Sequence, residues 1–296
     1  MNLEQFYNKN YKKLFLIPIA LLVISLLIIF NQYQKTGDIV NKDVSLKGGL
    51  SLEVYSDKTI EQSSFDNLEK QLNAKFNGMD FFLRKLVDFS SGQLNGVIIE
   101  SADIQEKEMK PVIESTLNIK LIADKNYFVK ETSSTLGKSF YNQMLSTILL
   151  AFAFMTITVL IIYRKLIPSV AIIMSPVLNM INTIAVVDLM GFRVSDATVA
   201  ALLLMIAYGV DTDILLSTKV LKRKEGTVFE RMYSSFITGL TMTAAAVVAL
   251  LFSYLGTNSF VLREMFVVLI IGLSSDVIST YLMNAGLLRW YLKNET

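Results

Sequence analysis

The sequence predicts an α-helical membrane protein with six transmembrane helices and one external α+β domain. Hydrophobic residues make up 52% of the 296 residues and charged residues only 18%, whereas a soluble domain carries about 25% charged residues. The apolar residues gather in runs that match a hydrocarbon core of about 30 Å. The segment between the first and second runs is too long for a connector and indicates a small domain.

The apolar runs define the predicted spans. They are Leu14–Phe30, Met144–Tyr163, Pro168–Val187, Ala197–Leu216, Phe236–Tyr254 and Met265–Leu288. The first run is long for the core of a signal peptide and no small-residue cleavage site follows it, so we expect it to be retained. The chain then divides into a tail and first helix (1–30), an external domain (31–143), and five further helices (144–296) with a cytoplasmic loop (217–235).

The distribution of Lys and Arg predicts the orientation in the membrane. With the N-terminus inside, the cytoplasmic segments hold twelve Lys and Arg residues, and the short outer loops hold only Arg193 and Arg263. The long first loop is exempt, because long domains are translocated largely regardless of charge. We therefore expect a multi-pass protein of the cell membrane, with both termini cytoplasmic and the large loop extracellular.

The external domain shows alternating strand and helix patterns. Leu50, Leu52 and Val54 alternate as in a strand, and apolar residues recur at helical spacing from Ile60 to Phe76. The remaining expected elements are strands at Phe81–Asp88 and Leu94–Glu100 around a Ser90–Gln93 turn, a helix from Ile104 that Pro111 must kink unless it lies in the first turn, and a strand at Tyr127–Thr132. The order β-α-β-β-α-β predicts a ferredoxin-like fold.

Composition also excludes several kinds of chemistry. Cysteine and histidine are both absent, so neither a disulfide nor a Cys/His metal site can form. The net charge of +2 gives no polybasic signature for nucleic acid. We expect no metal, no cofactor, no nucleic-acid partner and no enzymatic activity. Proton chemistry must then use Asp, Glu, Lys, Tyr or water.

Three aspartates inside the predicted spans are the candidate ion-responsive residues. Asp211 and Asp213 lie about 200° apart around a helix, so one points inward and the other does not. We expect Asp211 to be the stronger candidate, with Asp213 near the cytoplasmic end, where Lys219 can satisfy its charge. Asp276 lies midway along span six, where ionisable residues are usually functional, and we expect it to matter more than Asp213.

Polar residues at helical spacing support these candidates. Ser279, Thr280 and Asn284 extend a stripe from Asp276, and Asn179 and Asn182 share a face of span three. The alternative interpretation is interhelical hydrogen bonding that only holds the bundle together. Gly191 and Gly209 indicate positions of close approach between helices or of turns.

Three segments carry a resemblance to a known family. Lys47-Gly48-Gly49-Leu50, the stretch from Val199 to Asp211, and Ser279-Thr280 with Asn284 resemble motifs of the SecD/SecF protein-export family, of the resistance-nodulation-division type. The single short external domain is similar to the archaeal SecF branch. The resemblance implies half of a pseudo-symmetric twelve-helix bundle, completed by SecD. It also implies export of a translocating polypeptide through SecYE, supported by the proton or sodium gradient.

The resemblance is incomplete at the residues that would carry protons. Bacterial relatives have Asp where Asn179 falls, Arg where Lys219 falls and Gly where Asp276 falls, so their relay does not transfer directly. Three alternatives stay open: an independent transporter of small molecules or lipids, a passive assembly scaffold, and an intramembrane aspartyl protease. The protease alternative is weakened because residues 207–211 lack the Gly-Xaa-Gly-Asp pattern.

Overall fold

The computed structural model describes residues 3–56, 58–76, 81–87, 92–101, 104–223, 225–257 and 259–295. The chain forms two compact units. The helical unit comprises Met1–Asn41, Ser146–Arg193 and Ala197–Thr296, and the sheet unit comprises Lys42–Leu145 and Val194–Asp196.

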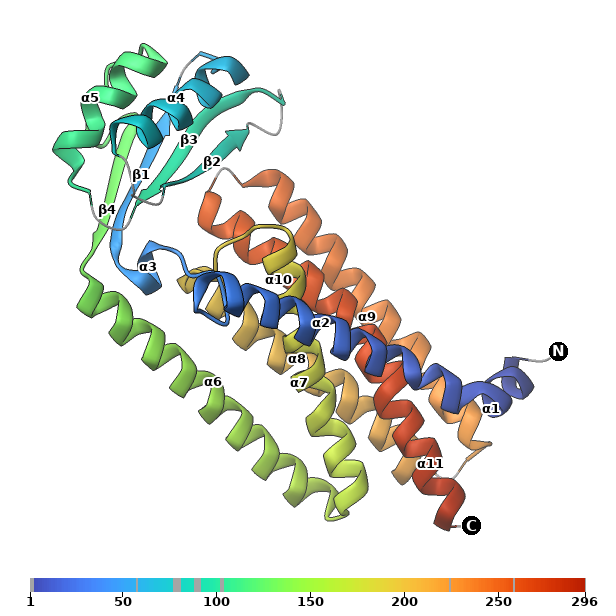
Figure 1. Cartoon of the computed structure of the whole chain (residues 1–296). Coiled ribbons are helices and arrows are strands. Elements are labelled where there is room, and N and C mark those ends of the chain that lie inside the picture. The colour runs from blue at the N-terminus through green and yellow to red at the C-terminus, as the bar shows by residue number, and fades with distance from the viewer. Residues whose placement is uncertain are drawn as a thin grey trace. The chain divides into compact units, whose positions relative to one another are not determined.

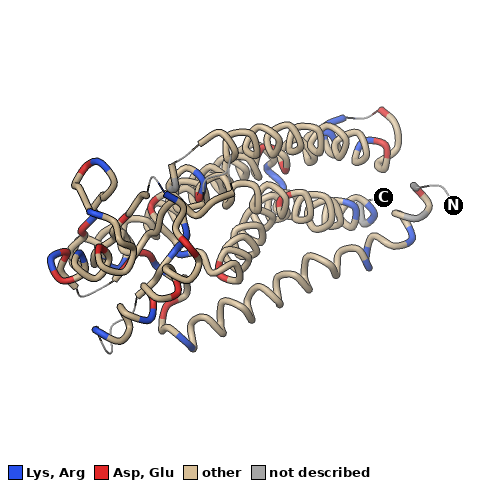
Figure 2. The backbone as a smooth tube through the Cα atoms, turned by 90° about the horizontal axis from the view of Figure 1, so that it is seen from above, with Lys and Arg blue, Asp and Glu red and all other residues tan. Residues whose placement is uncertain are grey.

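Long helices build the helical unit, which includes α6 from Ser146 and α8 from Ala197 onward (Figure 1). Their bounds are α1 Leu3–Leu14, α2 Leu16–Thr36, α6 Ser134–Tyr163, α7 Leu166–Leu189, α8 Asp196–Lys222, α9 Val228–Gly256, α10 Phe260–Ile278 and α11 Ala285–Glu295, with the π-helix η1 Ser279–Asn284 between α10 and α11. Within the described residues, six helical segments of 24 to 33 residues are long and apolar enough to cross a membrane. The predicted six spans are therefore confirmed. Figure 2 shows long stretches of these helices without charged residues.

Local chemistry explains where several of these helices begin and end. Pro18 lacks a backbone N–H, and α1 passes into α2 just before it, at Phe15, which keeps helical backbone angles. Arg164 has a φ of 52°, which turns the chain sharply between α6 and α7. A capping box starts α9, because the Thr227 hydroxyl accepts from the Glu230 N–H and the Glu230 carboxylate accepts from the Thr227 N–H.

The sheet unit has the predicted ferredoxin-like topology. Its elements are β1 Gly49–Tyr55, α4 Gln62–Lys75, β2 Phe81–Val87, β3 Leu94–Ser101, α5 Glu106–Leu117 and β4 Tyr127–Thr132. The strand order is β2-β3-β1-β4, and all three pairings are antiparallel. Figure 1 shows α4 and α5 on one face of this sheet. The alternating side chains of Leu50, Leu52 and Val54 pack there with apolar residues of both helices.

Some details of the sheet unit differ from the expectation. Of the two positions expected for Pro111, the structure shows the helix interior of α5. A short helix, α3 Val44–Lys47, precedes β1 and was not predicted, and the Asp43 side chain caps it by accepting from the Ser45 N–H at 2.9 Å. Of the expected Ser90–Gln93 turn, Ser90 and Ser91 lie outside the described residues.

The short segment Val194–Asp196, which ends at the first residue of α8, belongs to the sheet unit, which the sequence did not indicate. The Asp43 N–H donates to the Val194 carbonyl at 3.1 Å, and Lys130 Nζ lies 3.4 Å from Asp196 Oδ2. Because α8 begins at Asp196, the sheet unit is connected directly to the start of the helix that carries Asp211 and Asp213.

Gly48 is a position where a side chain should be strongly destabilising. Its φ is +90°, and an added Cβ would lie 2.5 Å from the Ser134 Cα atom. Gly92 has a φ of +67° with open space around it, so it is a matched control for backbone strain alone. We expect Gly48→Ala to lower stability by about 2–5 kcal/mol and Gly92→Ala by about 1–2 kcal/mol. Thermal unfolding of the full chain measures both, and equal shifts would contradict the packing argument.

A buried carboxylate pair as the candidate functional site

Two carboxylates lie inside the helical unit, one on each of two neighbouring helices. Asp213 of α8 has an exposed fraction of 0% and Asp276 of α10 has one of 2%. The two are close enough for their charges to interact. Two adjacent carboxylates in a water-poor interior cannot both stay ionised cheaply without a cation. The pair is therefore suited to hold a proton or a small cation.

Asp276 lies in a network of hydrogen bonds from α7 and α8. Its Oδ1 accepts from Asn179 Nδ2 at 3.4 Å and its Oδ2 lies 2.8 Å from Thr212 Oγ1. The same Thr212 hydroxyl lies 2.9 Å from the Gly209 carbonyl. A hydroxyl has a single proton and cannot donate to both oxygens at once. A protonated Asp276 can donate to Thr212, which frees the Thr212 proton for Gly209. Protonation thus completes this network.

Asp213 has a less complete set of partners. Its Oδ1 accepts from Asn284 Nδ2 at 2.7 Å, and Asn284 ends the π-helix η1, a type of segment often found at functional sites. The Ser175 hydroxyl is near Asp213 without reaching hydrogen-bond geometry.

Several buried polar atoms around the pair have no partner. Within the described residues, this applies to Asp213 Oδ2, Asn284 Oδ1, Asn179 Oδ1 and Ser175 Oγ. Buried polar atoms are almost always hydrogen-bonded, so each orphan calls for an explanation. All four are oxygens, and a carboxylate, two amide oxygens and a hydroxyl suit a proton, water or a hard monovalent cation better than a soft metal.

Gly209 allows α8 to approach Asp276. A Cβ at this position would lie 2.8 Å from Asp276 Oδ1 and 3.6 Å from its Cγ. The prediction that Gly209 is a close-approach position is confirmed, and the group it accommodates is the Asp276 carboxylate.

The structure separates the predicted site residues. Asp213, Asp276, Asn179, Thr280 and Asn284 come together, with Thr280 3.4 Å from Thr212. Asp211, expected to be the stronger candidate of its pair, is exposed on the outside of α8. Thr212 was not predicted, although its position between two aspartates was a signal.

Three other predicted residues have partners elsewhere. Lys219 donates to the Ser234 carbonyl at 3.0 Å and to Thr238 Oγ1 at 2.8 Å, both on α9, so the expectation that it satisfies Asp213 is wrong. Asn182 accepts from Ser25 at 2.9 Å and connects α7 to α2. Ser279 bonds to a carbonyl of its own helix.

Comparison with known proteins decides the family. Residues 113–294 match the family model described as protein export membrane protein SecD/SecF, C-terminal. The chain belongs to the SecD/SecF family. It is 35% identical to the protein-export membrane protein SecF of Methanothermobacter thermautotrophicus, over 96% of this chain and 94% of the relative. It is 31% identical to that of Methanocaldococcus jannaschii, over 96% of both chains.

A solved structure of this family shares the fold. The crystal structure of SecDF from Thermus thermophilus, described as a translocon-associated membrane protein, matches with a TM-score of 0.71 at 14% identity. The match covers 96% of this chain and 38% of that chain. The chain thus corresponds to less than half of SecDF. Its length is similar to that of its archaeal SecF relatives.

Proposed function

We propose that this chain is an accessory membrane subunit of Sec protein export, which pairs with a SecD-like protein and assists polypeptides that cross through SecYE. Family membership along nearly the whole chain carries the proposal. In cells that lack the chain, export of a secreted reporter should fall and its restoration should recover it. Unchanged export together with lost efflux of a small molecule would favour the transporter alternative instead.

The proposed orientation has both termini in the cytoplasm and the sheet unit outside, as the Lys and Arg distribution predicts. The chain has no cysteine, so single-cysteine labelling needs no background removal. We expect a membrane-impermeant maleimide to label Glu108→Cys in intact cells and to leave Glu225→Cys unlabelled until the cells are opened. Both side chains are exposed. Labelling of Glu225→Cys in intact cells would overturn the six-span orientation.

The outer face of α8 is the proposed contact with the SecD-like partner. Leu204 and Tyr208 are 45% and 49% exposed, and Asp211 lies on the same face one helical turn further on. A lipid-facing carboxylate inside a span costs roughly 2.5–3.5 kcal/mol. That cost disappears if Asp211 meets a polar or cationic group of a second chain.

Asp211→Lys is therefore expected to reduce co-purification with the SecD-like protein in mild detergent by tenfold or more, about 1.4 kcal/mol. Glu225→Lys, which makes the same reversal of charge in an exposed loop, is the control and should leave the yield of partner unchanged. Undiminished recovery of the partner with Asp211→Lys would place the contact elsewhere.

The Asp213–Asp276 pair is the proposed sensor of the proton or sodium gradient. Binding or release of a cation changes the charge inside the bundle, and such a change can shift helices between two arrangements. Because α8 carries Asp213 and begins at the segment that packs with the sheet unit, a movement of α8 would reach that unit directly. The first two spans connect to the same unit through the chain.

A further inference from the structure

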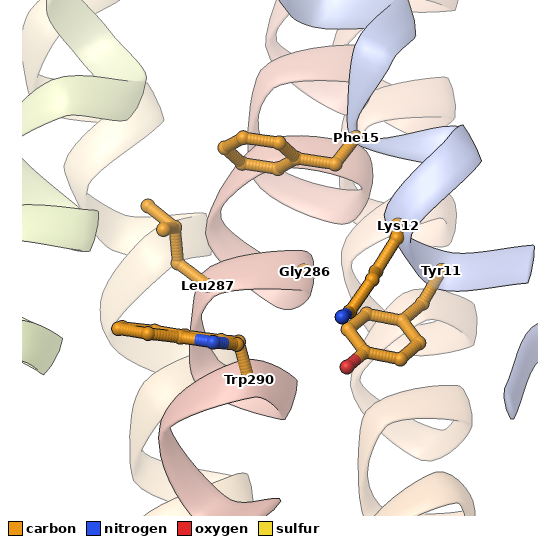
Figure 3. Close-up of a pocket in the computed structure, with 6 residues that line it drawn as sticks. All are labelled: Tyr11, Lys12, Phe15, Gly286, Leu287 and Trp290. Carbon is orange, nitrogen blue, oxygen red and sulfur yellow. The ribbon is translucent and has the colours of Figure 1, made fainter. Parts of the chain in front are cut away.

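A cavity lies between the first and last spans, at the ends that carry most of the basic residues. Its volume is about 350 Å³. Residues of α1, the α1–α2 junction and α11 line it: Tyr11, Lys12, Phe15, Gly286, Leu287 and Trp290 (Figure 3). None of them belongs to the carboxylate pair.

The cavity combines an apolar wall with two groups that favour an anion. Tyr11 is only 8% exposed, and within the described part of the chain its Oη has no hydrogen-bond partner. A buried hydroxyl without a partner is costly, and a phenol O–H donates readily to an anionic oxygen. Lys12 brings a positive charge beside it. Figure 3 shows Lys12 and Tyr11 next to each other, with Leu287 and Trp290 across from them.

The surroundings of the cavity match a bilayer interface. Gly286 lets the two spans approach, because a Cβ there would lie 3.1 Å from Phe15 Cδ2. Trp290 is 45% exposed, and tryptophan is enriched where spans leave the hydrocarbon core. The same ends carry Lys9, Lys13, Arg289 and Lys293, an arrangement that attracts anionic headgroups.

We propose that this cavity binds one anionic phospholipid. Its phosphate accepts from Tyr11 Oη and pairs with Lys12 Nζ, and an acyl chain lies against Phe15, Leu287 and Trp290. A helix of a partner protein is the less suitable occupant, because an apolar helix would leave both the phenol hydroxyl and the ammonium group unsatisfied.

The test compares lipid binding by the purified full chain and three variants. Native mass spectrometry in a detergent that keeps lipids bound counts retained phosphatidylglycerol, phosphatidylcholine with the same acyl chains, and inorganic phosphate. We expect selective retention of phosphatidylglycerol by the wild type and no retention of free phosphate. Lys12→Gln should weaken that retention about fivefold, the effect of one basic group near a membrane surface. Tyr11→Phe should weaken it about tenfold or more, the effect of one lost hydrogen bond to a charged group. Lys13→Gln, an exposed lysine that does not line the cavity, should not.

Several outcomes would overturn the proposal. Equal retention of the two lipids would remove the selectivity, and an equal loss with Lys13→Gln would show nonspecific attraction by the basic end. If Tyr11→Phe and Lys12→Gln bind lipid normally but lose the SecD-like partner, the cavity is a protein contact. The thermal stability of each variant is compared with that of the wild type. A variant that unfolds at the wild-type temperature but retains less lipid has lost binding and not its fold.

Discussion

Replacing Asp276 by asparagine is expected to remove the gradient-dependent part of export while leaving assembly with the SecD-like partner intact. Asparagine keeps the size of the side chain and can hydrogen-bond to Thr212, 2.8 Å away in the wild type, but it carries neither a charge nor a titratable proton. A bundle whose arrangement follows the occupancy of this carboxylate would lose its dependence on the gradient. Coupling energies of this kind correspond to about 5- to 150-fold in a measured response.

Asp213→Asn should have an effect of the same order. The sequence suggested a smaller one, because Lys219 was expected to satisfy Asp213. In the structure Lys219 is bonded to α9 and Asp213 is fully buried beside Asp276. The structure therefore gives no reason to expect a smaller effect on export from Asp213→Asn than from Asp276→Asn.

Both variants are tested by export of a secreted reporter, in cells with an intact ion gradient and in cells whose gradient has been dissipated. Co-purification checks the level of the complex. Asp66→Asn is the control, because this aspartate is exposed on α4 of the sheet unit, away from the carboxylate pair. Normal gradient dependence in Asp276→Asn would refute ion sensing by the pair. Loss of export that follows loss of the complex would identify the pair as a structural contact between helices.

Gly209→Ala is expected to impair the same response with little loss of folding. The added Cβ would lie 2.8 Å from Asp276 Oδ1, and the end of a side chain can move where backbone cannot. The carboxylate would be displaced from Thr212 and Asn179, so the expected loss of gradient-dependent export is again about 5- to 150-fold. Thermal unfolding should change by no more than about 1–3 kcal/mol, the usual cost of overpacking.

A double variant distinguishes this mechanism from general damage. If Gly209→Ala acts through Asp276, then adding it to Asp276→Asn should cause no further loss, because residues in one network are not additive. Gly256→Ala, which adds a Cβ with no neighbour within 4 Å, is the control for an alanine in a membrane helix. Additive losses in the double variant would show that Gly209 supports the bundle independently of Asp276.

The sequence by itself determined the architecture. Apolar runs of sufficient length predicted all six spans, because a span must be apolar along its whole length to reside in hydrocarbon. Alternation at Leu50, Leu52 and Val54 and the helical spacing after Ile60 predicted the ferredoxin-like unit, because one face of each element packs into a core. The stripe from Asp276 through Thr280 to Asn284 is indeed buried.

Only the tertiary structure decided which aspartates meet. The sequence placed Asp211 and Asp213 on opposite faces of one helix, but a span is apolar toward lipid and toward its neighbours alike, so hydrophobic periodicity does not mark the inward face. The partners of Lys219 on α9, the contact of Gly209 with Asp276, and the packing of Val194–Asp196 with the sheet unit depend on residues far apart in the chain. Close packing of specific helix pairs fixes such contacts, and no local pattern encodes them.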